Sequence, residues 1–134
     1  MTGVVVDASA IVALVLAEPL AEAIATHIED AQHRILSAAT FVELSIVVEA
    51  RRGLAGLTLV DDIMRDSEIE IVELDQALAR RAIKGWRQFG RGKHPARLNF
   101  GDCFTYALAA ETGYPILCTG NDFAQTDLAV LPPR

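Results

Sequence analysis

Short apolar runs that alternate with longer helix-forming stretches constrain the fold of this chain more than any other feature. The first run, Val4–Val6, is β-branched and continuous, and Asp7 ends it at once. Such runs are typical of parallel strands that are buried on both faces and joined by helices. The sequence therefore predicts an α/β sandwich with a mostly parallel sheet of four to five strands, flanked by helices. We expect strands at Val4–Val6, Arg34–Ser37, Ile69–Val72 and Pro115–Thr119, with a fifth at Leu128–Leu131.

Capping residues and glycines mark the helices between these strands. Asp7 or Ser9 is the expected N-cap of the first helix, and Asp75 caps the helix after the third strand. Gly53 and Gly113 are expected to end two others. We expect helices at Ala8–Glu18, Pro19–Ala31, Thr40–Arg52, Leu57–Asp66, Asp75–Phe89 and Phe100–Thr112, and a mobile loop at Gly90–Leu98.

Length and composition favour a single folded domain, residues 1–134, with one core. Hydrophobic residues make up 51% of the chain and the mean hydropathy is +0.29, which excludes disorder. So much apolar surface also favours a partner chain. The helices around Ile11–Leu16 and Leu57–Met64 are candidates for that contact, although packing in the core explains any one of their residues as well.

Cysteine use and hydropathy indicate the compartment. Cys103 and Cys118 fit neither a disulfide framework nor a zinc spacing, which favours a reducing environment. The apolar stretch Ala10–Ala17 is too short to cross a bilayer, and the first residues lack the basic region of a signal peptide. We therefore expect a cytoplasmic protein that makes no use of a membrane.

The charge is unevenly distributed. The formal net charge is −6, which argues against a protein that simply coats nucleic acid. Yet the segment from Arg80 to Arg97 carries seven of the twelve basic residues and no acidic one. Such a segment is either a solvated helix face or a local surface for a polyanion, because screening confines each field to about 8–10 Å. Its basic residues are Arg80, Arg81, Lys84, Arg87, Arg91, Lys93 and Arg97.

Two acids follow expected strands. Asp7 comes directly after Val4–Val6, and Asp122 comes just after the strand at Pro115–Thr119. A helix cap explains Asp7, and ordinary turn chemistry explains Asp122. In an open parallel sheet, however, the carboxyl ends of the strands form the edge where ligands bind. Asn121 and Asp127 are alternatives to Asp122.

Two further acids lie on expected helices. Glu43 has Ile46 and Val47 as its next neighbours along the helix and so no cation to pair with. Either this side of the helix faces solvent, or the carboxylate is neutral, paired from afar or bound to a metal. Asp102 follows Asn99 by three residues, which suits both a capping box and a metal ligand at the start of a rigid helix.

Four carboxylates brought together would repel one another, and a divalent cation is the usual way to hold such a group ionised. The four candidates offer only oxygen ligands. Oxygen-only sites favour Mg²⁺, with Mn²⁺ as a substitute. The sequence therefore predicts that Asp7, Glu43, Asp102 and Asp122 form a site for a divalent cation.

Four segments together resemble a PIN domain, and more narrowly a VapC-type toxin of a type II toxin–antitoxin system. They are VVDASA at 5–10, TFVEL at 40–44, NFGDC at 99–103 and TGNDF at 119–123. The resemblance runs in order from Val4 to about Leu131. It implies a PIN-like three-layer sandwich in which the acids at Asp7, Glu43, Asp102 and near Asp122 surround the metal. Many PIN domains place the fourth acid where this chain has Asn121, so Asp122 stands one residue late. The resemblance also suggests Thr40 as a supporting hydroxyl.

The resemblance implies a Mg²⁺- or Mn²⁺-dependent endoribonuclease toxin that a cognate antitoxin wraps and blocks. Asp7 and Asp102 would bind the metal directly, Asp122 directly or through water, and Glu43 would orient or deprotonate the attacking water. The basic residues expected to hold RNA phosphates are Arg87, Arg91, Lys93 and Arg97. We also expect a homodimer within the toxin–antitoxin complex.

Other classes of function make different demands on the sequence. A PIN-like module that binds RNA or protein without turnover stays open, since Asn121 replaces an expected acid. A phospho-acceptor domain of the receiver type needs paired acids near its start and a late lysine at a strand end. A phosphatase needs a second carboxylate two residues after the first, where this chain has Ser9. Neither pattern is present.

Overall fold

The computed structural model describes residues 3–132, and within them five parallel strands form one sheet in the order β3-β2-β1-β4-β5. The central strand β1 pairs with β2 on one side and β4 on the other. The predicted parallel sheet of an α/β fold is therefore confirmed. The strands are β1 (Gly3–Val6), β2 (His33–Ser37), β3 (Glu70–Val72), β4 (Ile116–Leu117) and β5 (Val130–Leu131).

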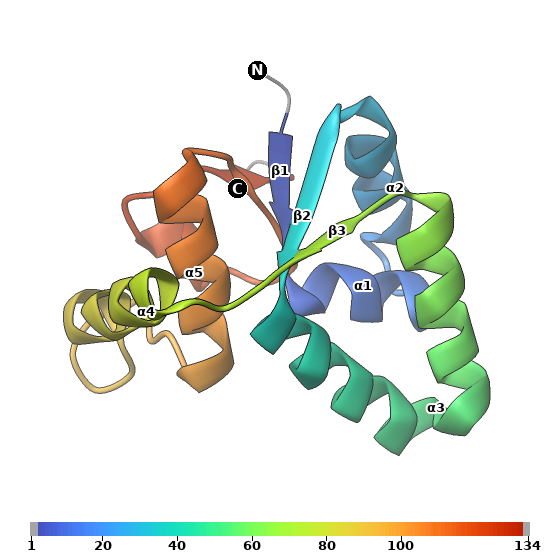
Figure 1. Ribbon diagram of the computed structural model, residues 1–134, viewed down its shortest axis with the longest axis horizontal. Helices are drawn as coiled ribbons and strands as arrows, with labels where there is room; N and C mark the ends of the chain where they lie inside the picture. Colours follow the sequence, from blue (N-terminus) through green and yellow to red (C-terminus); the bar gives the residue numbers. More distant parts are fainter. Residues whose placement is uncertain (1–2, 133–134) are drawn as a thin grey trace.

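Helices cover both faces of this sheet, which gives the predicted three layers. Helices α1, α2 and α3 lie on one side of the strands, and α4 and α5 lie on the other (Figure 1). The helices are α1 (Ala8–Val15), α2 (Ala21–Asp30), α3 (Ala38–Asp66), α4 (Gln76–Phe89) and α5 (Phe100–Thr112), with a 3₁₀ turn η1 (Phe123–Gln125).

The core has two halves, one on each face of the sheet. Val4 and Val6 of β1 point into the half formed with α1, α2 and α3. Val5 points into the half formed with α4 and α5. This alternation is the two-residue period of a strand, so one continuous valine run supplies both halves.

Helix ends follow the local signals where these are strong. Asp75 caps α4, and Asn99 and Gly113 bound α5, as predicted. Asp7, not Ser9, caps α1, and this helix ends at Val15, because the chain turns at Ala17 with a φ of 53°. That left-handed turn has no strong sequence signal.

Helix α3 joins two predicted helices into one bent element. Gly53 sits at the bend with a φ of 65°, a conformation that glycine adopts at little cost.

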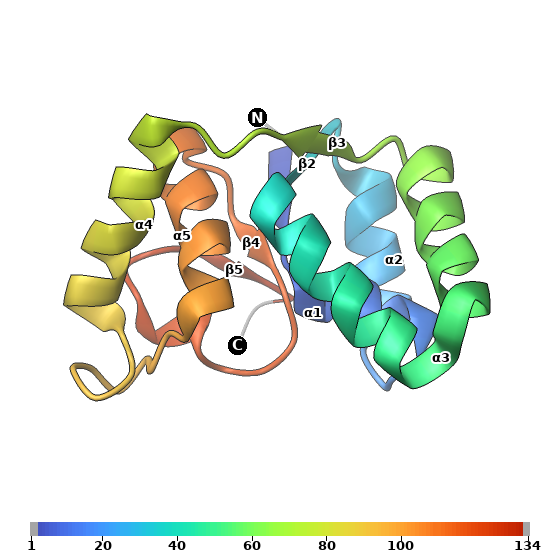
Figure 2. The same cartoon turned by 60° about the horizontal axis from the view of Figure 1, so that its bottom comes forward.

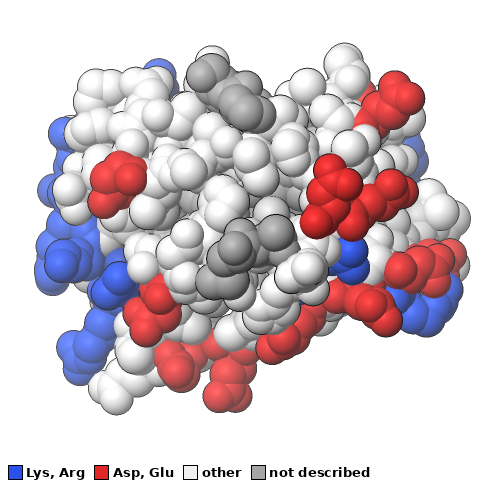
Figure 3. All heavy atoms as spheres, turned by 90° about the horizontal axis from the view of Figure 1, so that it is seen from above, with Lys and Arg blue, Asp and Glu red and all other residues white. Residues whose placement is uncertain are grey.

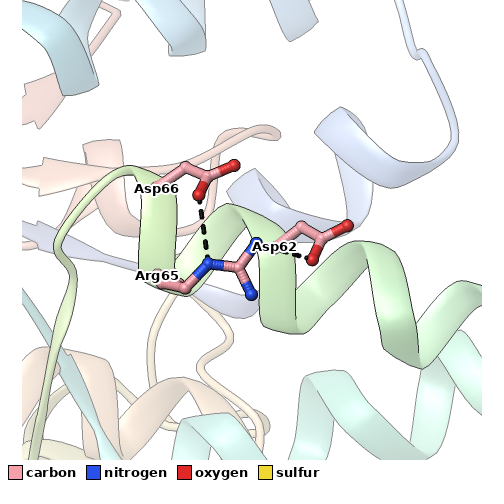
Figure 4. Close-up of polar contacts among 3 residues, drawn as sticks. All are labelled: Asp62, Arg65 and Asp66. Carbon is pink, nitrogen blue, oxygen red and sulfur yellow. Dashed lines mark hydrogen bonds and ion pairs between the residues drawn. The ribbon is translucent and has the colours of Figure 1, made fainter.

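The exposed last turn of α3 carries Arg65, whose guanidinium lies 2.9 Å from the carboxylate of Asp62 and 3.2 Å from that of Asp66 (Figure 4). Exposed pairs of this kind add little stability.

The side chains first considered as partner surface are largely part of the core. Ile11 and Met64 are buried, whereas Leu54 and Leu59 of α3 are exposed.

The loop after α4 is anchored at its ends by a bridge between Gly90 and Leu98. Among residues 3–132, no helix has the length and apolar character needed to span a membrane.

Candidate active site

A pocket of about 290 Å³ lies where the carboxyl end of β1 meets α3 and α5. The view onto this end of the molecule shows α5 and the first half of α3 on either side of the strands (Figure 2). The polar residues that line it are Asp7, Ser9, Glu18, Glu43, Asp102 and Thr119. Three of the four predicted acids therefore meet at the edge where parallel sheets bind ligands.

Asp7 is buried, with only 5% of its surface exposed, and both of its carboxylate oxygens accept hydrogen bonds. Its Oδ2 atom accepts the backbone N–H of Ser9 at 3.1 Å and the Ser9 hydroxyl at 2.7 Å. Its Oδ1 atom accepts the hydroxyl of Thr105 at 2.7 Å. Asp7 therefore caps α1 and also lines the pocket, so its role as a cap is compatible with the predicted functional role.

Asp102 lies in the first turn of α5 and completes a capping box with Asn99. Its Oδ2 atom accepts the N–H of Asn99 at 3.0 Å. The pKa of Asp102 is raised to about 7, chiefly by burial and also by the charges of Asp7, Asp122 and Glu43, against the lowering effect of that hydrogen bond. The carboxylate is therefore held in an electrostatically unfavourable place, which a cation would relieve.

Glu43 is half-buried on the wall of the pocket that α3 forms. Burial raises its pKa, and the charge of Asp7 adds to the effect. Its carboxylate lies directly over Gly101, where any Cβ atom would collide with it. The solvent-facing interpretation of this helix face is therefore wrong, and α3 and α5 approach closely because residue 101 is glycine.

Asp122 is exposed at the start of η1, and its charge contributes to the raised pKa of Asp102. Asp127 lies in a separate hollow with Arg81 and Lys84, where it accepts the hydroxyl of Tyr106 at 3.0 Å. Of these two acids, Asp122 is the one whose charge affects Asp102, and the assignment of the fourth acidic position stays a prediction.

The predicted RNA-contacting residues lie outside this pocket. Arg87 is on the last turn of α4, and Arg91, Lys93 and Arg97 are on the exposed loop that follows. The Lys93 ammonium lies 4.6 Å from the centre of the Trp86 ring. In the face shown in Figure 3, Lys and Arg gather at the margins, including the side of α4, and a band of Asp and Glu runs along the lower edge.

Sequence reasoning missed two residues that the fold brings to the site. Glu18 lines the pocket because the left-handed turn at Ala17 brings it back from the end of α1. Thr105 is buried beside Asp7, although 98 residues separate them. A polar residue one helical turn after Asp102 in an apolar helix was the available signal for Thr105.

The donor set fits a hard divalent cation. The pocket's ionisable side chains are all carboxylates, and burial together with the charges of neighbouring acids raises the pKa values of Glu43 and Asp102. Within residues 3–132, no three His, Cys, Asp or Glu side chains are already arranged as a metal cluster. Burial also raises the pKa of the nearby Cys103 thiol to about 11, so this thiol is neutral at pH 7.

A larger hollow of about 560 Å³ lies between α4 and α5. It is lined mainly by apolar residues, among them Ile83, Trp86 and Phe104. The residue at its rim, Phe100, is 81% exposed. This groove lacks the acids that define the pocket at the sheet edge and is a surface feature of a different kind.

Comparison with known proteins identifies the family and agrees with the fold. The PIN domain family model matches residues 4–128. VapC ribonuclease Mb0640 of Mycobacterium bovis is 40% identical over 129 residues, which cover 95% of this chain and 97% of that protein. The crystal structure of VapC20 of Mycobacterium tuberculosis, described as a sarcin-ricin loop cleaving toxin, superimposes with a TM-score of 0.79 at 14% identity, over 97% and 99% of the two chains.

A toxin–antitoxin complex from Klebsiella pneumoniae shares the fold as well, with a TM-score of 0.68 at 16% identity. The alignment covers 96% of this chain and 97% of that one. The five-stranded parallel sheet of this chain agrees with the fold of these toxins. The chain belongs to the PIN domain family and, within it, to the VapC ribonucleases.

Proposed function

We propose that this protein is a metal-dependent endoribonuclease, the toxin of a toxin–antitoxin pair, and that it hydrolyses RNA phosphodiester bonds in the acidic pocket. The observation that carries the proposal is the meeting of Asp7, Glu43 and Asp102 around one pocket, with Asp122 close enough to act on Asp102. The 40% identity to a VapC ribonuclease over most of the chain supports the same activity.

Asp7 and Asp102 are the residues that would hold Mg²⁺ or Mn²⁺, and Asp122 would contribute directly or through water. When bound, the cation lowers the pKa of a bound water and offsets the charge that develops on the phosphoryl oxygens. Asp7 suits this task because its side chain is fixed from three directions. Asp102 suits metal binding because burial and the neighbouring acids raise its pKa, so a cation would stabilise its ionised form.

Glu43 is the candidate general base. Burial and the charge of Asp7 raise its pKa, which makes its carboxylate a stronger proton acceptor than an exposed glutamate. Its position over Gly101 fixes it beside Asp102. Glu43 would therefore orient the attacking water and take its proton.

Arg87, Arg91, Lys93 and Arg97 would hold RNA phosphates outside the pocket. All four are exposed, and they belong to the stretch Arg80–Arg97, which holds seven of the chain's twelve basic residues and no acidic one. Contacts of this kind position RNA without reading its sequence.

The decisive experiment measures RNA cleavage by the purified, antitoxin-free protein with Mg²⁺, Mn²⁺ or EDTA, beside the variant Asp7→Asn. Metal-dependent cleavage that falls by about 10³-fold or more in the variant is expected, a loss of roughly 4 kcal/mol in transition-state stabilisation. Equal cleavage by both proteins would reveal a contaminating nuclease. Tight RNA binding without cleavage by either would favour a binding module.

We also propose that the protein forms a homodimer in the cytoplasm and that a cognate antitoxin binds it. Val42 and Ile46 of α3 and Phe100 of α5 are large exposed apolar side chains near the two walls of the pocket, which suit a protein contact. Sedimentation of the isolated protein at micromolar concentration should give a dimer. Copurification with the product of an adjacent reading frame should identify the antitoxin.

A further inference from the structure

The buried hydroxyl of Thr105 has a partner that is unusual for a helix interior. Helix α5 is apolar around it, and Thr105 is 0% exposed. A threonine inside a helix commonly donates to a carbonyl one turn earlier, as Thr112 does to Leu108 at 2.9 Å. Thr105 instead donates to Asp7 Oδ1 at 2.7 Å, across to another element.

A second hydroxyl supports the first. The Oγ1 atoms of Thr40 and Thr105 lie 3.3 Å apart, and both residues are buried. A hydroxyl has one proton to donate, and that of Thr105 is used on Asp7, whose carboxylate can only accept. Thr40 is therefore the donor to Thr105, and the chain of hydrogen bonds runs from Thr40 through Thr105 to Asp7.

The bonds to Asp7 leave its two oxygen atoms unequal. Oδ2 accepts two hydrogen bonds from Ser9, which use both of its lone-pair directions. Oδ1 accepts one, from Thr105, and keeps one lone pair. By this count Oδ1 is the atom of Asp7 that is left for a ligand in the pocket, and Thr105 is the group that holds it.

Thr105 also stands in a fixed relation to the next acid. It follows Asp102 by three residues on α5, so both side chains lie on one face of a rigid helix. Thr40 precedes Glu43 by three residues on α3 in the same way. The two hydroxyls thus connect the three elements that carry the acids of the pocket.

We infer that Thr105, supported by Thr40, is a positioning residue that fixes Asp7 so that its Oδ1 atom serves as the metal ligand. The inference rests on the proposed function, since it assigns a task toward the proposed metal. Outer groups that orient a metal ligand commonly change metal affinity by about 10–100-fold when they are removed.

The test compares Thr105→Val, which removes the hydroxyl and keeps the shape, with Thr105→Ser, which keeps the hydroxyl. Thr112→Val is the matched control, since it removes a hydroxyl from the same helix away from the pocket. Mn²⁺ affinity is measured directly from the electron paramagnetic resonance of free Mn²⁺ during titration. RNA cleavage is measured against metal concentration, and thermal unfolding without metal monitors folding.

Thr105→Val should bind Mn²⁺ about 10–100-fold more weakly. Its cleavage should therefore need more metal, and the loss should be smaller at saturating metal. Thr105→Ser should recover most of the affinity, and Thr112→Val should match the parent protein. Thr40→Val should show a smaller loss, because the bond from Thr105 to Asp7 remains.

Two results would overturn the inference while leaving the proposed nuclease intact. One is wild-type Mn²⁺ affinity in a folded Thr105→Val variant. The other is an equal loss of Mn²⁺ affinity in Thr105→Ser and Thr105→Val, because serine keeps the hydroxyl and the affinity would then not follow the presence of that group. If the parent protein neither binds Mn²⁺ nor cleaves RNA with any metal, the proposed function fails and the inference fails with it.

Discussion

The two walls of the acidic pocket treat their carboxylates in opposite ways. On the wall formed by β1 and α1, Asp7 accepts three hydrogen bonds, from Ser9 and Thr105. On the wall formed by α3 and α5, Asp102 accepts one backbone N–H, and Glu43 rests against Gly101. Burial raises the pKa of both Asp102 and Glu43.

The difference shows how one site can be both ordered and reactive. Asp7 is fixed by donors before any ligand arrives, so little ordering remains when it binds. Asp102 and Glu43 lack that support, so a cation or a proton stabilises them more. The fold thus supplies a fixed ligand on one wall and groups that respond to charge on the other.

The difference between the two walls should have its largest effect at Asp102, on the free energy of unfolding without metal. Its pKa is raised from an ordinary 3.8 to about 7, so between these pH values the folded state binds the proton more tightly than the unfolded state. The free energy of unfolding should therefore fall as the pH rises from about 4 to 7 and stay low above. Asp102→Asn should remove this loss and raise the free energy of unfolding at pH 8.

The upper limit of that gain is about 4 kcal/mol, at about 1.36 kcal/mol for each pKa unit, and about 2 kcal/mol is expected once solvent screening is allowed for. Urea unfolding in EDTA at pH 4 and pH 8 measures it. A gain that is the same at both pH values would contradict the assignment to the ionised carboxylate.

Asp7→Asn should have the opposite effect on stability. The amide nitrogen of asparagine cannot accept a hydrogen bond, so either the Ser9 donors or the Thr105 hydroxyl would lose an acceptor. Donors left unpaired in a buried place cost about 1–3 kcal/mol. The same urea experiment at pH 8 should show Asp7→Asn less stable and Asp102→Asn more stable than the parent, and two shifts of the same sign would break the comparison.

Gly101→Ala should disturb the wall of α3 and α5 without touching Asp7. The added Cβ atom would push the Glu43 carboxylate away, so RNA cleavage should fall by about tenfold or more, roughly 1.4 kcal/mol. Gly85→Ala is the matched control, since a Cβ there meets the Tyr106 ring instead. Equal cleavage losses in the two variants at equal stability would mean that the position of Glu43 is unimportant.

The smallest expected effect concerns the basic loop outside both walls. Replacing Arg91 and Arg97 together by alanine should weaken RNA binding and reduce the slope of log K against log salt by about 1.4, at about 0.7 for each contact with single-stranded RNA. Arg51→Ala with Arg52→Ala removes two exposed cations from α3 as a control. An unchanged slope in the first variant would make the loop plain solvated surface.

Local signals predicted the fold well where a few neighbouring residues decide the outcome. The bounds of α5 follow from Asn99 and Gly113, whose caps involve only adjacent turns. Strand β1 followed from its valines. The early end of α1 was missed because Ala17 adopts a left-handed turn that nothing in its own neighbourhood demands.

The site shows the same division. Asp7 and Asp102 were predicted because a strand end and a helix start can be read locally. Glu18 and Thr105 were missed, since their places depend on a turn and on a contact across 98 residues. The sequence alone also could not show that the charge of Asp122 affects Asp102, whereas Asp127 bonds Tyr106 in a separate hollow.

The pairing of β1 with β4 has a consequence for folding during synthesis of the chain. The strand made first must wait for one made more than a hundred residues later, because Val5 aligns with Ile116 and Val6 with Leu117. Asp102 and Thr105 are also made late. A nascent chain carries Asp7 and Glu43 early, yet it encloses no finished pocket until its last quarter has folded back. A chain built in this order has no complete acidic pocket for most of its own synthesis.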